Sequence, residues 1–166
     1  MRATVLAAAL VLSALPTPAA AQLANHAISV ESGVSTPLHG RAAPGAAFAL
    51  SATAWIDGFD RGDLEGVLRV ALASAPQTVG RASTAVLATG GLRLSLGRAP
   101  LRPQLFADLG WARLRGGTAG DRVAYGLGAG LEWFPVPDLS VAARAALRGA
   151  GAALGAEGVL GLAAYF

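Results

Sequence analysis

The residues from Arg122 to Trp133 alternate between two kinds of side chain. Their odd positions carry Val, Tyr, Leu, Ala, Leu and Trp, whereas their even positions carry Gly and Ala with a charged residue at each end. A period of two places successive side chains on opposite faces of a β-strand. Residues 135–138 (Pro-Val-Pro-Asp) interrupt the pattern, because proline has no N–H to donate to a strand ladder. The alternation resumes over residues 139–147, which predicts a tight hairpin with one apolar face.

The same alternation recurs along most of the chain, in segments separated by Gly-, Pro- or Asp-containing turns. The predicted strands cover residues 26–34, 46–56, 64–73, 84–96, 101–112, 122–133, 139–148 and 154–166. A tilted strand needs ~9–11 residues to cross a membrane, and an even number of such strands is typical of outer-membrane barrels. The pattern therefore predicts an all-β fold, an eight-stranded antiparallel up-and-down transmembrane β-barrel.

Alternation alone does not decide which face of the strands meets lipid. A soluble barrel of the lipocalin type, which binds an apolar ligand inside, would bury the apolar face. Aromatic residues near strand ends favour lipid contact, because they form girdles at membrane interfaces. The predicted girdle consists of Trp111, Tyr125, Trp133 and Phe166. The other face is rich in Gly, Ala and Ser with charges of both signs, which suits a narrow lumen. We therefore expect the apolar face to point outward, with the soluble periplasmic barrel as the alternative.

The inward face carries six arginines and five carboxylates. They are Glu31, Glu65, Arg69, Arg93, Arg102, Asp108, Arg122, Glu132, Arg144, Arg148 and Glu157. Buried charges need partners, so the set predicts a network of ion pairs that fills a polar lumen. A gate or a binding site for a small polar solute is the alternative use of the same residues. The interior of an eight-stranded barrel is just wide enough for side chains to fill, so we expect no open pore.

Three inward glycines, Gly126, Gly128 and Gly130, resemble the start of a dinucleotide-binding loop. The pattern fails because Leu131 takes the place of the last glycine and prolines follow where a helix should begin. We expect these glycines to leave room in the lumen instead.

The N-terminus has the features of a secretory signal peptide. Arg2 precedes an apolar stretch at residues 3–15, and three alanines at 19–21 offer a cleavage site. We expect residues 1–21 to be this signal and residues 22–166 to form the barrel domain. The chain of 166 residues has no Cys, 14% charged residues and a net charge of +3. Disulfides are therefore excluded, and we expect no nucleic-acid partner.

Two stretches resemble a known family. The residues GLGAGLEWFPVPDLSVAARAAL (126–147) resemble the strand–turn–strand of small outer-membrane β-barrel proteins of the OmpA/OmpX type, within the porin-like outer-membrane β-barrel domain family. The C-terminal LGLAAYF (160–166) is similar to the terminal-strand signal that the barrel-assembly machinery reads. Ala164 departs from the family, which often has a larger apolar or aromatic residue there.

The resemblance implies an integral protein in the outer membrane of a Gram-negative bacterium. It implies contacts with outer-membrane lipid and with the barrel-assembly machinery through the C-terminal strand, and we expect a monomer. Both termini would lie in the periplasm. The loops that would face outside lie around residues 36–45, 74–83, 114–122 and 149–153.

The chain contains two histidines, His26 and His39. Some small outer-membrane barrels are enzymes that modify lipid A, and His39 near Ser35 and Thr36 keeps that alternative open. No Ser, His and acid spacing repeats a known motif, and two distant histidines without Cys give no metal-ligand cluster. We therefore expect a structural or interaction protein, with no catalytic residue, no metal and no cofactor.

Overall fold

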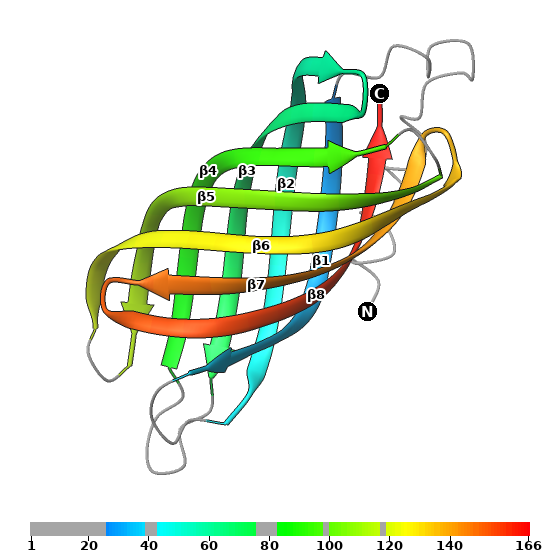
Figure 1. Ribbon diagram of the computed structural model, residues 1–166. Helices are drawn as coiled ribbons and strands as arrows, with labels where there is room; N and C mark the ends of the chain where they lie inside the picture. The colour runs from blue at the N-terminus through cyan, green and yellow to red at the C-terminus, as the bar shows by residue number, and fades with distance from the viewer. Residues whose placement is uncertain (1–25, 39–42, 76–82, 98–99, 117–118) are drawn as a thin grey trace.

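The structure is a computed structural model that describes residues 26–38, 43–75, 83–97, 100–116 and 119–166. These residues form eight strands that close into a barrel (Figure 1). The strands are β1 (His26–Pro37), β2 (Gly45–Phe59), β3 (Gly62–Ala75), β4 (Ser83–Leu96), β5 (Leu101–Arg115), β6 (Gly120–Val136), β7 (Leu139–Ala150) and β8 (Ala153–Tyr165). Among the described residues, no helix is long and apolar enough to span a membrane.

Each strand pairs antiparallel with its neighbours in the sequence, and β1 pairs with β8 to close the barrel. The closing ladder runs from Ala27 opposite Tyr165 to Pro37 opposite Gly155. Closure gives every strand two partners, so the backbone needs no water to satisfy its hydrogen bonds. The predicted eight-stranded up-and-down topology is confirmed.

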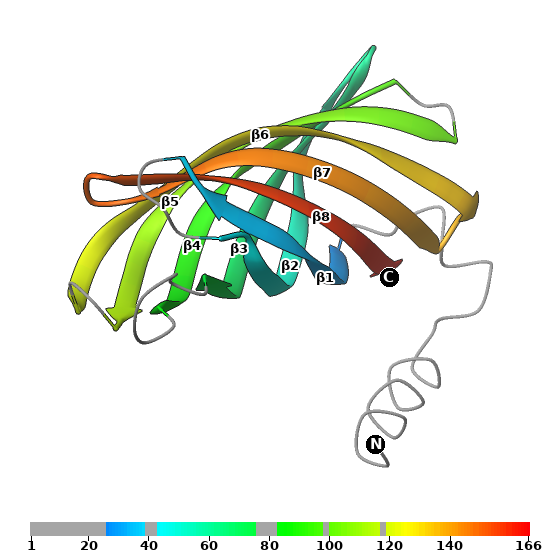
Figure 2. The same ribbon diagram turned by 90° about the horizontal axis from the view of Figure 1, so that it is seen from below.

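The two ends of the barrel differ in their connections. The terminal end, as we name it, holds His26, Phe166 and the connections β2–β3, β4–β5 and β6–β7. The backbone amide of Phe166 donates to the carbonyl oxygen of His26 there, at 2.9 Å. The loop end holds the other four connections. Figure 2 shows the β7–β8 hairpin and the C-terminus at opposite ends of the molecule. The hairpin turns at Gly151, whose φ of +61° favours glycine.

Large apolar side chains cover the outside of the barrel. Leu68 is 70% exposed and Leu127 is 65% exposed, whereas the inward Glu132 is 1% exposed. A soluble barrel would show the opposite distribution, because water would meet the polar face. The apolar wall therefore argues against the soluble lipocalin-like alternative and agrees with a transmembrane barrel whose apolar face meets lipid.

Two irregularities interrupt the ladders near the terminal end. Trp55 pairs with the inward-facing Glu65, and the register shifts between Trp55 and Asp57. Trp55 thus shares the register position of Glu65, its side chain is 46% exposed, and the bulge follows it. The second shift lies in β6 between Trp133 and Val136, where a proline interrupts the ladder.

Candidate functional site

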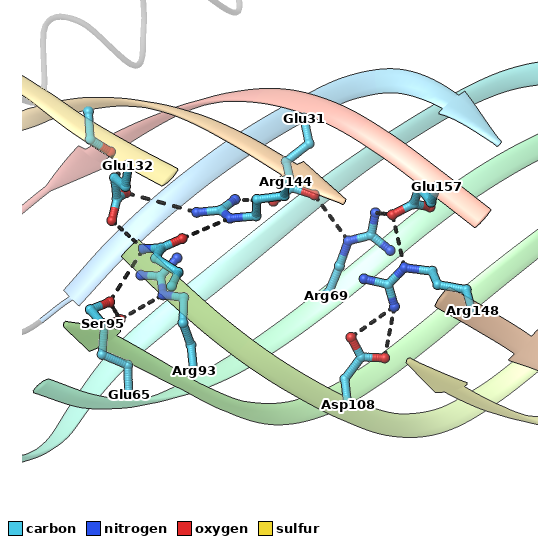
Figure 3. Close-up of polar contacts among 12 residues, drawn as sticks. Glu31, Glu65, Arg69, Arg93, Ser95, Asp108, Glu132, Arg144, Arg148 and Glu157 are labelled. Carbon is cyan, nitrogen blue, oxygen red and sulfur yellow. Dashed lines mark hydrogen bonds and ion pairs between the residues drawn. The ribbon is translucent and has the colours of Figure 1, made fainter. Parts of the chain in front are cut away.

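A chain of buried ion pairs crosses the middle of the lumen (Figure 3). Arg69 of β3 donates from Nε to Glu31 Oε2 at 3.1 Å and from Nη2 to Glu157 Oε1 at 2.7 Å. Arg148 of β7 donates from Nε to the same Glu157 oxygen at 2.9 Å. Its Nη1 contacts both carboxylate oxygens of Asp108 at 2.8 Å. These ion pairs connect strands β1, β3, β7 and β8 across the interior, and the contact with Asp108 connects β5 as well.

Arg144 of β7 joins this chain to a second group of polar side chains. It donates from Nη1 to Glu31 and from Nε to the amide oxygen of Gln104 at 3.1 Å. The amide nitrogen of Gln104 donates to Glu132 Oε2 at 2.5 Å and lies 3.3 Å from Ser95 Oγ. The connections therefore continue without a break toward the terminal end of the lumen.

Glu132 is the carboxylate on which uncharged donors converge. Ser140 Oγ donates to it at 2.5 Å and the hydroxyl of Tyr165 at 2.9 Å. The nearest ion pair to Glu132 among the described residues is at 3.9 Å, from Arg144 Nη2. Its neighbour Glu65 is paired directly instead, with Arg93 Nε at 2.6 Å. Neutral hydrogen bonds therefore do most of the stabilising at Glu132.

The connected network contains more acids than arginines. Its carboxylates are Glu31, Glu65, Asp108, Glu132 and Glu157, and its arginines are Arg69, Arg93, Arg144 and Arg148. With every group ionised, five negative charges face four positive ones. The uncharged donors on Glu132 stabilise the excess charge, since hydrogen bonds to a carboxylate are stronger than bonds between neutral groups.

Two of the predicted lumen arginines lie toward the ends of the barrel and are less buried than the others. Arg102 is partly exposed at the terminal end, where its Nη1 lies 3.6 Å from Asp63 Oδ2. Its guanidinium also stacks over the ring of Phe134, 4.6 Å from the ring centroid. Arg122 is exposed at the loop end and donates to the backbone carbonyl of Asp121. The prediction placed Arg122 on the correct face of β6, but too far along the strand for a buried position.

The β6 glycines leave space for the network, as predicted. A Cβ built on Gly126 would lie 2.6 Å from Arg148 Nη1 and 2.8 Å from Asp108 Oδ1. A Cβ on Gly128 would overlap the ring of Phe106. Real side chains do not approach so closely, so a side chain at Gly128 would collide with the Phe106 ring, and one at Gly126 would force the ends of Arg148 and Asp108 to move.

The interior toward the loop end is apolar, which corrects the prediction of a polar lumen throughout. A cluster of small and aliphatic side chains occupies it: Ala49, Ala71, Leu87, Ala112 and Ala124, with Ala73, Ala85 and Ala150 beside them. A cavity of about 260 Å³ lies among Leu87, Leu114 and Leu154, with Arg148 and Glu157 also in its lining. The network itself encloses a cavity of only about 40 Å³.

The predicted girdle residues lie on the outward face at both ends. Trp111 and Tyr125 lie toward the loop end and are about half exposed, as are Trp133 and Phe166 toward the terminal end. The ring of Phe166 stacks on His26 with 6.2 Å between centroids. Each of these rings contributes to the outer surface of the barrel.

Four uncharged members of the network were not predicted from the sequence. They are Ser95, Gln104, Ser140 and Tyr165. Each occupies an inward position of the alternation, so a polar residue on the inward face was the available signal. Charge was a poor criterion because it selected Arg122 and left out Gln104, which is 1% exposed.

Candidate catalytic groups are sparse in the part of the chain that the structure describes. No three His, Asp or Glu side chains there lie close enough to hold a metal ion. His39, on which the enzymatic alternative depends, lies outside the described residues. The predicted signal peptide at residues 1–21 also lies outside them.

The chain matches no protein-family model and no curated protein sequence. Solved structures match over nearly their whole length. Neisserial surface protein A is 13% identical with a TM-score of 0.71, and the match covers 86% of this chain and 97% of that one. The fold is that of small outer-membrane β-barrels.

Other structures repeat this likeness. The outer-membrane enzyme PagL is 15% identical with a TM-score of 0.61, covering 81% of this chain and 97% of that one. The N-terminal β-barrel domain of Pseudomonas aeruginosa OprF is 14% identical with a TM-score of 0.57, covering 84% and 97%. These neighbours share the barrel fold and include both an enzyme and a barrel domain. Similarity to them therefore shows the fold and not the function.

Proposed function

We propose that this protein is an integral outer-membrane β-barrel with a structural or interaction role and a lumen closed by its own side chains. The ion-pair chain from Arg144 through Arg69 to Asp108 carries the proposal, because it joins opposite walls of the barrel. Its apolar outer wall supports a lipid environment.

The small space that the network leaves supports a closed lumen. A cavity of about 40 Å³ has room for a few water molecules. A hydrated ion would have to break paired buried charges to pass, and removing one partner of such a pair costs about 3–5 kcal/mol. The larger cavity near Leu114 opens toward the loop end, and the network lies between it and the terminal end. A solute entering it would stop at Arg148 and Glu157.

The same architecture supports proposals about the surroundings of the barrel. Outer-membrane lipid would cover the apolar wall, and the barrel-assembly machinery would engage the C-terminal strand β8. Periplasmic termini would place the terminal end inside and the loop end outside. The protein would act as a monomer, since closure leaves no strand edge for pairing with another copy.

Two measurements on the protein from a membrane fraction test the proposal. A closed barrel resists SDS until heated, so unboiled and boiled samples should migrate differently on a gel. In a planar bilayer the same sample should give no steady conductance, with a sixteen-stranded porin as the open control. Release by osmotic shock without a gel shift would contradict the membrane barrel. A stable channel from the unmodified protein would contradict the closed lumen.

A further inference from the structure

The outward face of β5 changes character at the loop end. Its outward positions are apolar from Leu101 to Leu109, then carry Trp111, and end with Arg113 and Arg115. Both arginines are exposed, the side chain of Arg113 to 58%. Arg113 and Arg115 thus follow Trp111 directly in the row of β5 side chains that faces lipid.

The length of β5 places these arginines in the headgroup layer. Leu101 pairs with Trp133, so the outward positions from Leu101 to Trp111 link one aromatic position to the other. At ~3.3 Å per residue and ~40° tilt, these ten residues span about 25 Å of membrane depth, the usual height of the apolar band. Arg113 then lies about 5 Å beyond the band, where lipid phosphates are found.

Acidic neighbours do not neutralise this pair. Asp121 lies 4.0 Å from Arg113, and the two side chains are each more than half exposed, so the ion pair is weak. Arg115 pairs in the ladder with Thr84, and no described carboxylate lies within ion-pair distance of it. The exposed Arg122 adds another positive charge nearby.

The terminal end has the opposite balance among the described residues outside the buried network. Its charged side chains are Asp57, Asp60, Arg61, Asp63, Arg102 and Asp138, so acids outnumber arginines. At the loop end the described arginines are Arg113, Arg115 and Arg122, and Asp121 is the described acid beside them. Among the residues that the structure describes, the cation excess therefore lies at one end of the barrel, which indicates an anionic partner in one leaflet.

We propose that Arg113 and Arg115 bind phosphate groups of anionic lipid headgroups in the leaflet at the loop end, which in an outer membrane are the phosphates of lipid A. The inference rests on the proposed function, because that function places the loop end outside. A guanidinium matches phosphate oxygens with two parallel hydrogen bonds. The apolar stem of each arginine can lie along the wall near Trp111 while its charged group reaches the headgroups.

The test measures lipid A binding to the full barrel in a neutral detergent. The probes are bisphosphorylated lipid A and the same lipid after removal of its phosphates. The variants are Arg113→Gln/Arg115→Gln, Arg115→Gln alone, and Arg61→Gln as a matched control, because Arg61 is exposed at the terminal end. Each arginine near a charged surface contributes roughly a fivefold change in affinity.

The expected result is that the dissociation constant for bisphosphorylated lipid A rises roughly fivefold in the single variant and thirtyfold in the double variant. The control should bind like the unmodified protein, and dephosphorylated lipid A should not distinguish the variants. Equal binding by all variants, or an equal loss in Arg61→Gln, would overturn the inference. Full displacement of lipid A by millimolar inorganic phosphate would point to a free-anion site instead.

The gel shift separates this inference from the proposed function. Variants that keep the heat-dependent shift but bind lipid A normally would refute the arginine site and leave the barrel intact. An unmodified protein without the shift would refute the proposed function itself. Arg115→Gln keeps the test decisive if the double variant fails to fold, because Arg115 makes no described ion pair.

Discussion

Replacement of Arg69 by Met tests the lumen network most directly. Arg69 connects Glu31 to Glu157, with donor–acceptor distances of 3.1 and 2.7 Å, and its side chain is 5% exposed. Met has a comparable volume and no charge, although its side chain is shorter, so the variant removes the cation while leaving only a small space. Glu31 and Glu157 would each lose one partner, and the excess of negative over positive charges in the network would rise from one to two.

The expected loss is about 3–5 kcal/mol, the usual cost of removing one partner from a buried pair. This is a large share of a typical total stability of ~5–15 kcal/mol. Urea unfolding in detergent, followed by fluorescence of the three tryptophans, would measure it. Arg61→Met, at an exposed turn, should change the free energy of unfolding by less than about 0.5 kcal/mol.

A second substitution sharpens the test. Adding Glu157→Gln to Arg69→Met removes one of the two carboxylates that lost a partner, so the double variant should be more stable than Arg69→Met alone. A coupling of about 0.5–3 kcal/mol between the two changes is expected for groups in direct contact. If Arg69→Met folds and loses less than about 1 kcal/mol, the network does not stabilise the barrel as argued.

Two further predictions use the same unfolding assay. Glu132→Ala should destabilise the barrel by about 3 kcal/mol. Glu132→Gln should cost less, since the amide oxygen still accepts from Ser140 and Tyr165 and one excess charge is removed, although the amide nitrogen cannot accept from Gln104 Nε2. Equal losses would contradict the role of the hydroxyl donors. Gly126→Ala should lower the free energy of unfolding by about 1–3 kcal/mol, because the added methyl group overlaps Arg148. Gly158→Ala is the control and should be tolerated, because nothing lies within 4 Å of its added Cβ. A tolerated Gly126→Ala would show that the network can shift.

The architecture could be predicted because a strand repeats every two residues. The alternation through Val123, Tyr125 and Leu127 specifies which residues share a face, and no tertiary information is needed for that. The turns were equally visible, since Pro135 and Pro137 cannot continue a ladder. The outward direction of the apolar face followed from the positions of aromatic residues at strand ends.

Pairing of the charges depended on tertiary structure. Arg69 and Glu157 are 88 positions apart in the sequence, and Arg144 and Glu31 are 113 apart. Only closure of β1 on β8 and the register of each ladder bring such residues to the same depth. Alternation assigns a face but no depth, which is why Arg122 was expected in the lumen and lies at the loop end instead.

The interior of the barrel also differs in character between its two ends. Ala71 and Leu87 share an inward face with Arg69 and Arg93, yet they lie in an apolar layer toward the loop end. The sequence by itself determined the strands, their faces and the class of barrel, because these follow from local periodicity. Which inward residues meet, and whether they form a charged or an apolar layer, was decided by strand register, because register sets the height of each side chain in the barrel.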